Sequence, residues 1–78
     1  MELLTIQQVA EIQGVSVPLI KWYYLESTTS KIKLKYHKAR GGKVNIDGDV
    51  YNLHGHLKKA RVIILKSDLE EWQAKLLE

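Results

Sequence analysis

The sequence contains no cysteine and no phenylalanine, and it has a single proline in 78 residues. Without cysteine the chain forms neither disulfides nor cysteine-bound metal sites, so a small hydrophobic core has to stabilise it. The longest aliphatic run, Val62 to Leu65, is far shorter than the roughly 20 residues that cross a bilayer. Residues 1–5 carry an acid where a secretory signal carries cations. We therefore expect one soluble, cytoplasmic domain covering residues 1–78, without membrane contact.

The charges are unevenly distributed along the chain, whose net charge is only +3. Lys31 to Lys66 contains ten cations and two acids, whereas the residues before it hold one cation and three acids and those after it one cation and four acids. A local positive block suits a polyanion-binding surface, because cations that neutralise phosphates release condensed counterions. A solvated lysine-rich loop has the same composition, so composition alone leaves both interpretations open.

Two short helices are predicted near the N-terminus. Thr5 precedes apolar residues at helical spacing and is followed three positions later by Gln8, so a capped helix begins after Thr5. Gly14 ends this helix, and Ser16 caps a second helix that runs to about Glu26. Two helices joined by a tight turn that contains glycine form a helix-turn-helix.

The middle of the chain predicts β structure. Residues 31–36 alternate between lysine and apolar side chains, which is typical of a half-buried strand with one face on the core. Residues 61–65 form an apolar, β-branched run and are the expected partner strand. The apolar side chains expected to face the core from the first strand are Ile32, Leu34 and Tyr36.

Two shorter patterns complete the prediction. The pair Asp47-Gly48 favours a type I′ turn in a minor hairpin that pairs Val44 with Tyr51. Residues 67–70 read as a capping box that begins a third helix. Apolar residues of this helix recur at helical spacing and predict its buried face: Leu69, Trp72 and Leu76.

These elements and several motifs resemble the excisionase-type branch of the MerR-like winged-helix family. Residues 4–16 resemble the family's opening helix and turn, and Lys21-Trp22-Tyr23 lies where MerR regulators have a basic residue followed by two tyrosines. Residues 64–72 resemble the strand and helix that end many such domains. The resemblance implies an α+β winged helix-turn-helix: two N-terminal helices, a β-hairpin wing with a long insertion over residues 37–60, and a short C-terminal helix.

The resemblance also implies a function. Members of this branch bind double-stranded DNA, bend attachment sites, assemble on them cooperatively and direct an integrase toward excision, without catalytic activity of their own. We therefore expect a phage or mobile-element excisionase located with the nucleoid. Two alternatives remain open: a phage transcriptional regulator of the same fold, and a protein-interaction adaptor. The adaptor would use an apolar patch of Val17, Trp22 and Leu25.

The second helix is the expected DNA-reading element. Helical geometry places Leu19, Ile20, Tyr23 and Tyr24 on a core arc and the other residues outward. Lys21 then reaches a phosphate or a guanine, while Val17 and Pro18 make only van der Waals contacts, so sequence discrimination is modest and relies on DNA deformability. For the Trp22 ring we favour packing on Trp72 in the core over contact with the DNA backbone. The residues expected at DNA are Ser16, Val17, Pro18, Lys21 and Trp22.

The wing is the second expected contact. Its tip, residues 38–43, would reach the minor groove with Arg40 inserted, and the glycine pair at 41–42 would let the backbone approach closely. The alternative is a solvated loop. The wing residues expected at DNA are Lys33, Lys35, Lys38, Arg40 and Lys43.

No sequence pattern supports catalysis, a cofactor or a metal. His54 and His56 alternate, and His37 could join them, but no acidic or cysteine ligand lies nearby in the sequence. Asp47 and Asp49 flank a turn glycine and are interpreted as turn residues. We expect neither an enzyme nor a metalloprotein.

Overall fold

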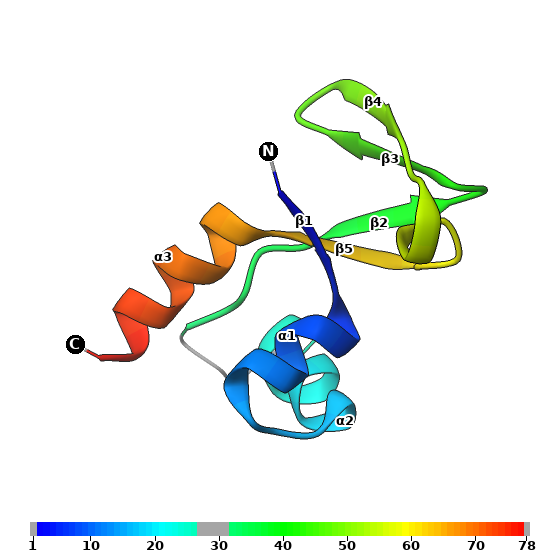
Figure 1. The fold of residues 1–78 in the computed structure, drawn as a ribbon. Coiled ribbons are helices and arrows are strands. Elements are labelled where there is room, and N and C mark those ends of the chain that lie inside the picture. Colours follow the sequence, from blue (N-terminus) through cyan, green and yellow to red (C-terminus); the bar gives the residue numbers. More distant parts are fainter. Residues whose placement is uncertain (1, 27–31, 78) are drawn as a thin grey trace.

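The computed structural model describes residues 2–26 and 32–77 and has an α+β fold (Figure 1). In this part of the chain an antiparallel sheet has the strand order β1-β5-β2-β3-β4. α1 and the following helix cover one face of the sheet, while the β3–β4 hairpin curls over the other (Figure 1). The strands are β1 (Leu3–Thr5), β2 (His37–Arg40), β3 (Lys43–Ile46), β4 (Asp49–Asn52) and β5 (Val62–Leu65). The helices are α1 (Ile6–Gln13), α2 (Val17–Leu19), η1 (Ile20–Leu25), η2 (Gly55–Leu57) and α3 (Lys66–Leu76).

Both N-terminal helices begin as predicted. The Gln8 amide donates to the Thr5 hydroxyl at 3.1 Å, and the Thr5 amide donates to the Gln8 side chain at 2.9 Å, which completes the capping box. Gly14 ends α1 with φ of 68°, a conformation that glycine adopts without steric cost. Ser16 caps α2 by accepting a hydrogen bond from the Leu19 amide at 3.4 Å. β1, which precedes α1 and pairs with β5, was not predicted.

The second helix, residues 17–25, starts as α2 and continues as the π-helix η1. The Glu26 amide donates to the Lys21 carbonyl, five residues earlier, at 3.1 Å. An i→i+5 turn holds one more residue than an α-turn and places Leu25 on the same side as Ile20. Leu25 is therefore buried, contrary to the prediction, and Leu19 and Tyr23 are exposed instead of buried.

The prediction of a strand at residues 31–36 is wrong for the part that the structure describes. Residues 32–36 belong to no strand, although Leu34 is only 1% exposed and Ile32 and Tyr36 pack against the same core. The Leu34 amide donates to the carbonyl of Tyr24, at the end of the second helix, at 3.1 Å. Alternation correctly predicted the inward side chains, but the backbone bonds to a helix end instead of to a strand. Lys31 lies outside the described residues.

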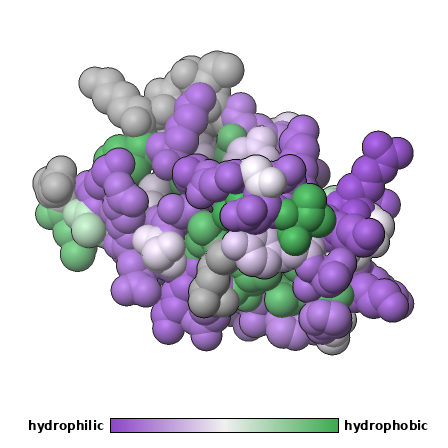
Figure 2. All heavy atoms as spheres, turned by 90° about the horizontal axis from the view of Figure 1, so that it is seen from above, coloured by the Kyte–Doolittle hydropathy of each residue, from purple (hydrophilic) through white to green (hydrophobic). Residues whose placement is uncertain are grey.

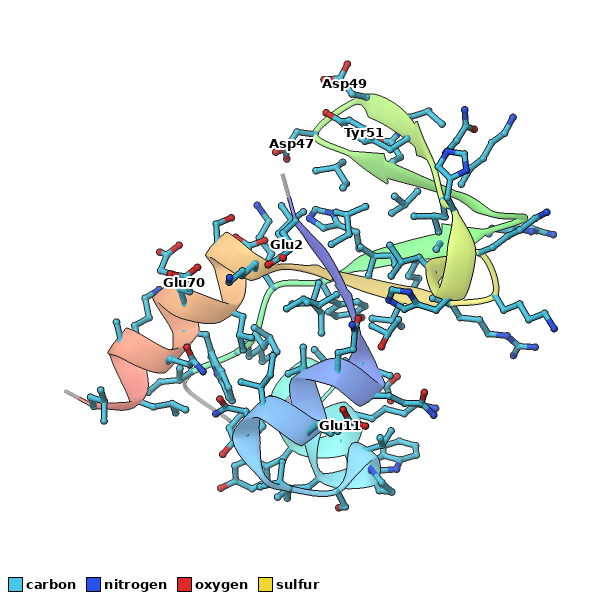
Figure 3. All side chains as sticks on the ribbon, viewed as in Figure 1. Glu2, Glu11, Asp47, Asp49, Tyr51 and Glu70 are labelled. Carbon is cyan, nitrogen blue, oxygen red and sulfur yellow. The ribbon has the colours of Figure 1, made fainter. Side chains whose placement is uncertain are left out.

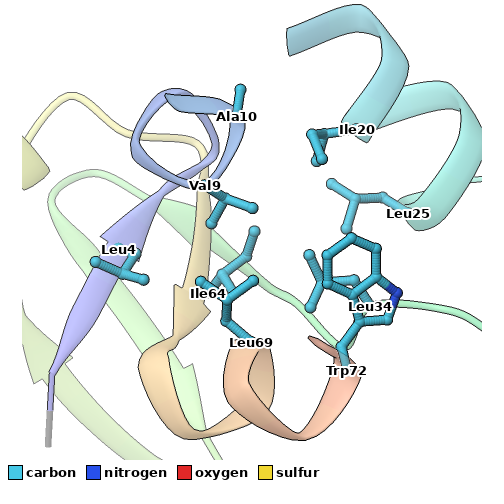
Figure 4. Packing of buried hydrophobic residues seen from close by; sticks show 9 residues of the cluster. All are labelled: Leu4, Val9, Ala10, Ile20, Leu25, Leu34, Ile64, Leu69 and Trp72. Carbon is cyan, nitrogen blue, oxygen red and sulfur yellow. The ribbon is translucent and has the colours of Figure 1, made fainter. Parts of the chain in front are cut away.

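The predicted strand at residues 61–65 is confirmed as β5, but its partners are β1 and β2. β5 separates two hydrophobic cores, and Ile63 and Ile64 are both fully buried. The core on the helix side is shown in Figure 4 and contains Leu4, Val9, Ala10, Ile20, Leu25, Leu34, Ile64, Leu69 and Trp72. The core on the other side contains Ala39, Val44, Ile46, Leu53 and Ile63.

The minor hairpin is confirmed, with Val44 opposite Tyr51. Asp47 and Gly48 occupy its turn with φ of 54° and 92°, as a turn with two left-handed residues requires. The prediction for the third helix is only partly right. α3 buries Leu69 and Trp72, but it begins one residue before Ser67, no side chain caps it, and Leu76 is exposed.

Candidate nucleic-acid interface

A cleft of about 430 Å³ lies between the second helix and the sheet. Val17, Lys21 and Leu25 line it from the helix, and Lys38 and Val62 from β2 and β5. Lys38 faces this side because it pairs with Val62, and paired residues in an antiparallel sheet project from the same face. The cleft therefore has an apolar floor and a cationic rim contributed by both halves of the chain.

A second cleft, of about 800 Å³, lies at the β2–β3 turn. Five of its nine lining residues are cationic and none is acidic. It shares Lys38, Lys59, Ala60 and Arg61 with the first cleft, so the two clefts adjoin. We call the combined feature the cationic groove; its cations are Lys21, Lys38, Arg40, Lys58, Lys59 and Arg61.

In the described part of the chain, the cations of the cationic groove form no salt bridges. Among residues 2–26 and 32–77, the lysines with a carboxylate within 4.0 Å are Lys66 and Lys75, and both lie outside the groove. Glu26 is the one carboxylate that lines the groove in this part of the chain. Like charges gathered without partners repel one another, so the fold carries an electrostatic cost that a bound polyanion would remove.

The carboxylates labelled in Figure 3 lie away from the β2–β3 turn. Glu2 lies at the start of β1, Glu11 on α1, Asp47 and Asp49 at the β3–β4 turn, and Glu70 on α3. Side chains that end in nitrogen project from the β2–β3 turn and from the segment before β5 (Figure 3). Viewed from above, that end of the molecule is covered mainly by hydrophilic side chains (Figure 2). Positive charge is thus concentrated at the β2–β3 end of the sheet, although Lys33, Lys35, Lys66 and Lys75 lie elsewhere.

The structure brings four of the predicted DNA-contacting residues into this groove: Val17, Lys21, Lys38 and Arg40. Lys43 is exposed and pairs with Arg40 across the β2–β3 turn. Ser16 and Pro18 are exposed at the start of the second helix. Lys33 and Lys35 are not in the groove.

Lys33 and Lys35 line a smaller cleft of about 140 Å³, together with Asp68, Glu71 and Lys75. Charges of both signs meet there, so this cleft offers a weaker field to an anion. The alternation of residues 31–36 correctly placed the two lysines on one side of the segment. It could not show that α3 supplies carboxylates to that side.

The favoured position of Trp22 is wrong. Trp22 is 64% exposed, and Tyr24 packs on Trp72 in its place, with ring centroids 4.6 Å apart. The Lys21 ammonium lies 5.5 Å from the centre of the Trp22 ring, within cation–π range. An exposed indole beside an unpaired cation is available to a ligand at the edge of the groove.

None of the site residues predicted from the sequence lies in the run Lys58-Lys59-Ala60-Arg61, although the cationic groove takes three cations from it. Their signal was present, since they belong to the basic block, but nothing in the sequence showed that residues 55–61 fold back beside β2. Of the histidines considered for a metal, His37 lies 4.0 Å from Asp68, and His56 lies 3.4 Å from Gln8.

Comparisons with protein-family models, curated proteins and solved structures find no match for this chain. Within the described residues no helix is both long and apolar enough to span a membrane. The function is therefore inferred from the cationic groove itself.

Proposed function

We propose that this protein is a winged helix-turn-helix protein that binds double-stranded DNA through the second helix and the β2–β3 hairpin. The observation that carries the proposal is that Val17 and Lys21 of the helix and Lys38 of the hairpin line one cleft. One duplex can contact both elements at once, the helix in the major groove and the hairpin in the adjacent minor groove.

The shape of the hairpin supports this role. β2 and β3 are joined by the two-residue turn Gly41-Gly42, with φ of 60° and 75°, and Arg40 and Lys43 pair across it. The turn therefore presents two cations and no bulky side chain at its tip. A narrow cationic tip suits the minor groove, where phosphates of both strands approach closely.

The outward face of the second helix favours a modest sequence preference. Its exposed residues are Pro18, Leu19, Lys21, Trp22 and Tyr23. Lys21 is the charged one among them, and it can reach a phosphate or a guanine. Most of the binding free energy then comes from phosphate contacts and from the ease of deforming the site. This balance suits an architectural protein, so we propose that it is an excisionase that bends attachment-site DNA and directs an integrase toward excision.

The apolar patch expected for the adaptor alternative, Val17, Trp22 and Leu25, is not exposed as a whole. Leu25 is buried and Val17 is half-buried against the core, so of the three expected residues Trp22 alone is exposed. The exposed apolar residues of the helices include Ile12, Leu19 and Tyr23 as well, so an adaptor would have to use a different patch from the one expected.

The proposal is tested by duplex binding, DNA bending and excision. We expect fluorescence anisotropy to detect a complex with a 30-base-pair duplex, and energy transfer between dyes on the duplex ends to increase when the protein bends it. An excision assay with the integrase and attachment sites of one mobile element should proceed further with the protein present. Binding and bending without an effect on excision would favour the transcriptional regulator, and absence of duplex binding at low salt would refute the proposal.

A further inference from the structure

Residues 55–61 form a structured element in which backbone contacts hold the cations in place. η2 is followed by a turn in which the Lys58 amide donates to the Gly55 carbonyl and the Ala60 amide to the Leu57 carbonyl, at 3.2 and 3.0 Å. Leu57 and Ala60 pack against the core on the other side of β5, which contains Val44, Leu53 and Ile63. With these two residues anchored inward, Lys58, Lys59 and Arg61 remain exposed.

Two contacts fasten this element to the β2–β3 hairpin. The Ala39 amide donates to the Arg61 carbonyl at 2.8 Å, which extends the pairing of β2 with β5. A Cβ atom added to Gly42 would lie 3.5 Å from the Lys58 Cγ atom, so the stem of Lys58 lies against the hairpin turn. The hairpin and residues 58–61 therefore present their cations as one preorganised surface, and less conformational entropy is lost when an anion binds.

We propose that Lys58, Lys59 and Arg61 form a second phosphate-binding site. This site contacts the backbone of one DNA strand, while the second helix contacts the backbone of the other. The inference rests on the proposed function, because it names a further part of the same duplex as the ligand. The second cleft has five cations and no acid, which is the charge pattern of a phosphodiester site. The hairpin would enter the minor groove, with one strand held at Lys21 and the other at residues 58–61.

The test compares two double variants of the full chain that remove equal charge. K58A/K59A removes the proposed contacts, and K33A/K35A is the control, since Lys33 and Lys35 lie in the mixed-charge cleft. With a 30-base-pair duplex, K58A/K59A should bind about tenfold more weakly at 0.1 M salt, and the slope of log affinity against log salt should become shallower by about 1.8. K33A/K35A should change either value much less. All four lysines are exposed, and the thermal melting of both variants should match that of the wild type.

Hydroxyl-radical footprinting locates the contact. The wild type should protect two backbone tracts across one minor groove, and K58A/K59A should lose protection of one tract and retain the other. Equal binding by both double variants, with both tracts protected, would refute the second site and leave the proposed function standing. Binding to a single strand of the same length as tightly as to the duplex would also refute it, because the proposed site depends on two strands. Wild-type protein that binds no duplex would refute the proposed function itself.

Discussion

The double variant K21A/K38A tests whether one duplex contacts both the second helix and the β2–β3 hairpin. Lys21 and Lys38 line the same cleft from these two elements, and neither has a carboxylate partner among the described residues. Each phosphate contact contributes about 0.9 to the slope of log affinity against log salt, so six cations in the groove predict a slope of about −5.4. Removing two contacts should leave a slope of about −3.6.

These slopes translate into measurable affinities. Between 50 and 200 mM salt the wild-type affinity should fall about 2,000-fold, and that of K21A/K38A about 150-fold. Anisotropy titrations of a labelled duplex at four salt concentrations measure both slopes. Each single variant should change the slope by about 0.9, and the two changes should add, because the lysines contact different phosphates. If either single variant keeps the wild-type slope, that lysine contacts no phosphate and the shared-cleft reasoning is wrong.

Three further predictions concern the stability of the fold and the contact of Trp22 with DNA. L34A should destabilise the protein by about 2 to 5 kcal/mol and lower its melting temperature by about 10 °C or more. K35A, at an exposed position, is the control. An unchanged melting temperature of L34A would show that residues 32–36 do not anchor the core. G42A should cost about 1 kcal/mol, since φ is 75° there while the nearest atom would lie at an ordinary 3.5 Å, and urea unfolding measures the loss. W22F should abolish the change in fluorescence on duplex binding and keep the unfolding signal of the buried Trp72, whereas a change that persists would place the duplex away from the second helix.

Interactions between residues close in the sequence were sufficient to predict two local structures. The Thr5–Gln8 capping box and the Asp47-Gly48 turn each depend on residues a few positions apart. Their hydrogen bonds and backbone angles are largely set before any long-range contact forms, so the sequence could predict them.

The errors occur where a local pattern has two physical solutions. Alternation at residues 32–36 requires an inward Leu34, and the protein meets this requirement by bonding the Leu34 amide to a helix end. The inward and outward residues of the second helix were predicted from α-helical geometry, but the π-turn of η1 places Leu25 inward. In both cases packing against the core selected the backbone, and the sequence window contained no signal of that choice.

The sequence by itself determined that the chain is α+β, where its first helix begins and ends, and that its positive charge is concentrated between residues 31 and 66. Only the tertiary structure decided which of those cations lie together. Lys38 faces the second helix because of its register with Val62, and Lys58 lies against the β2–β3 turn because Leu57 and Ala60 pack against the core that contains Ile63. A binding surface is formed by residues far apart in the chain, and long-range packing sets their relative positions.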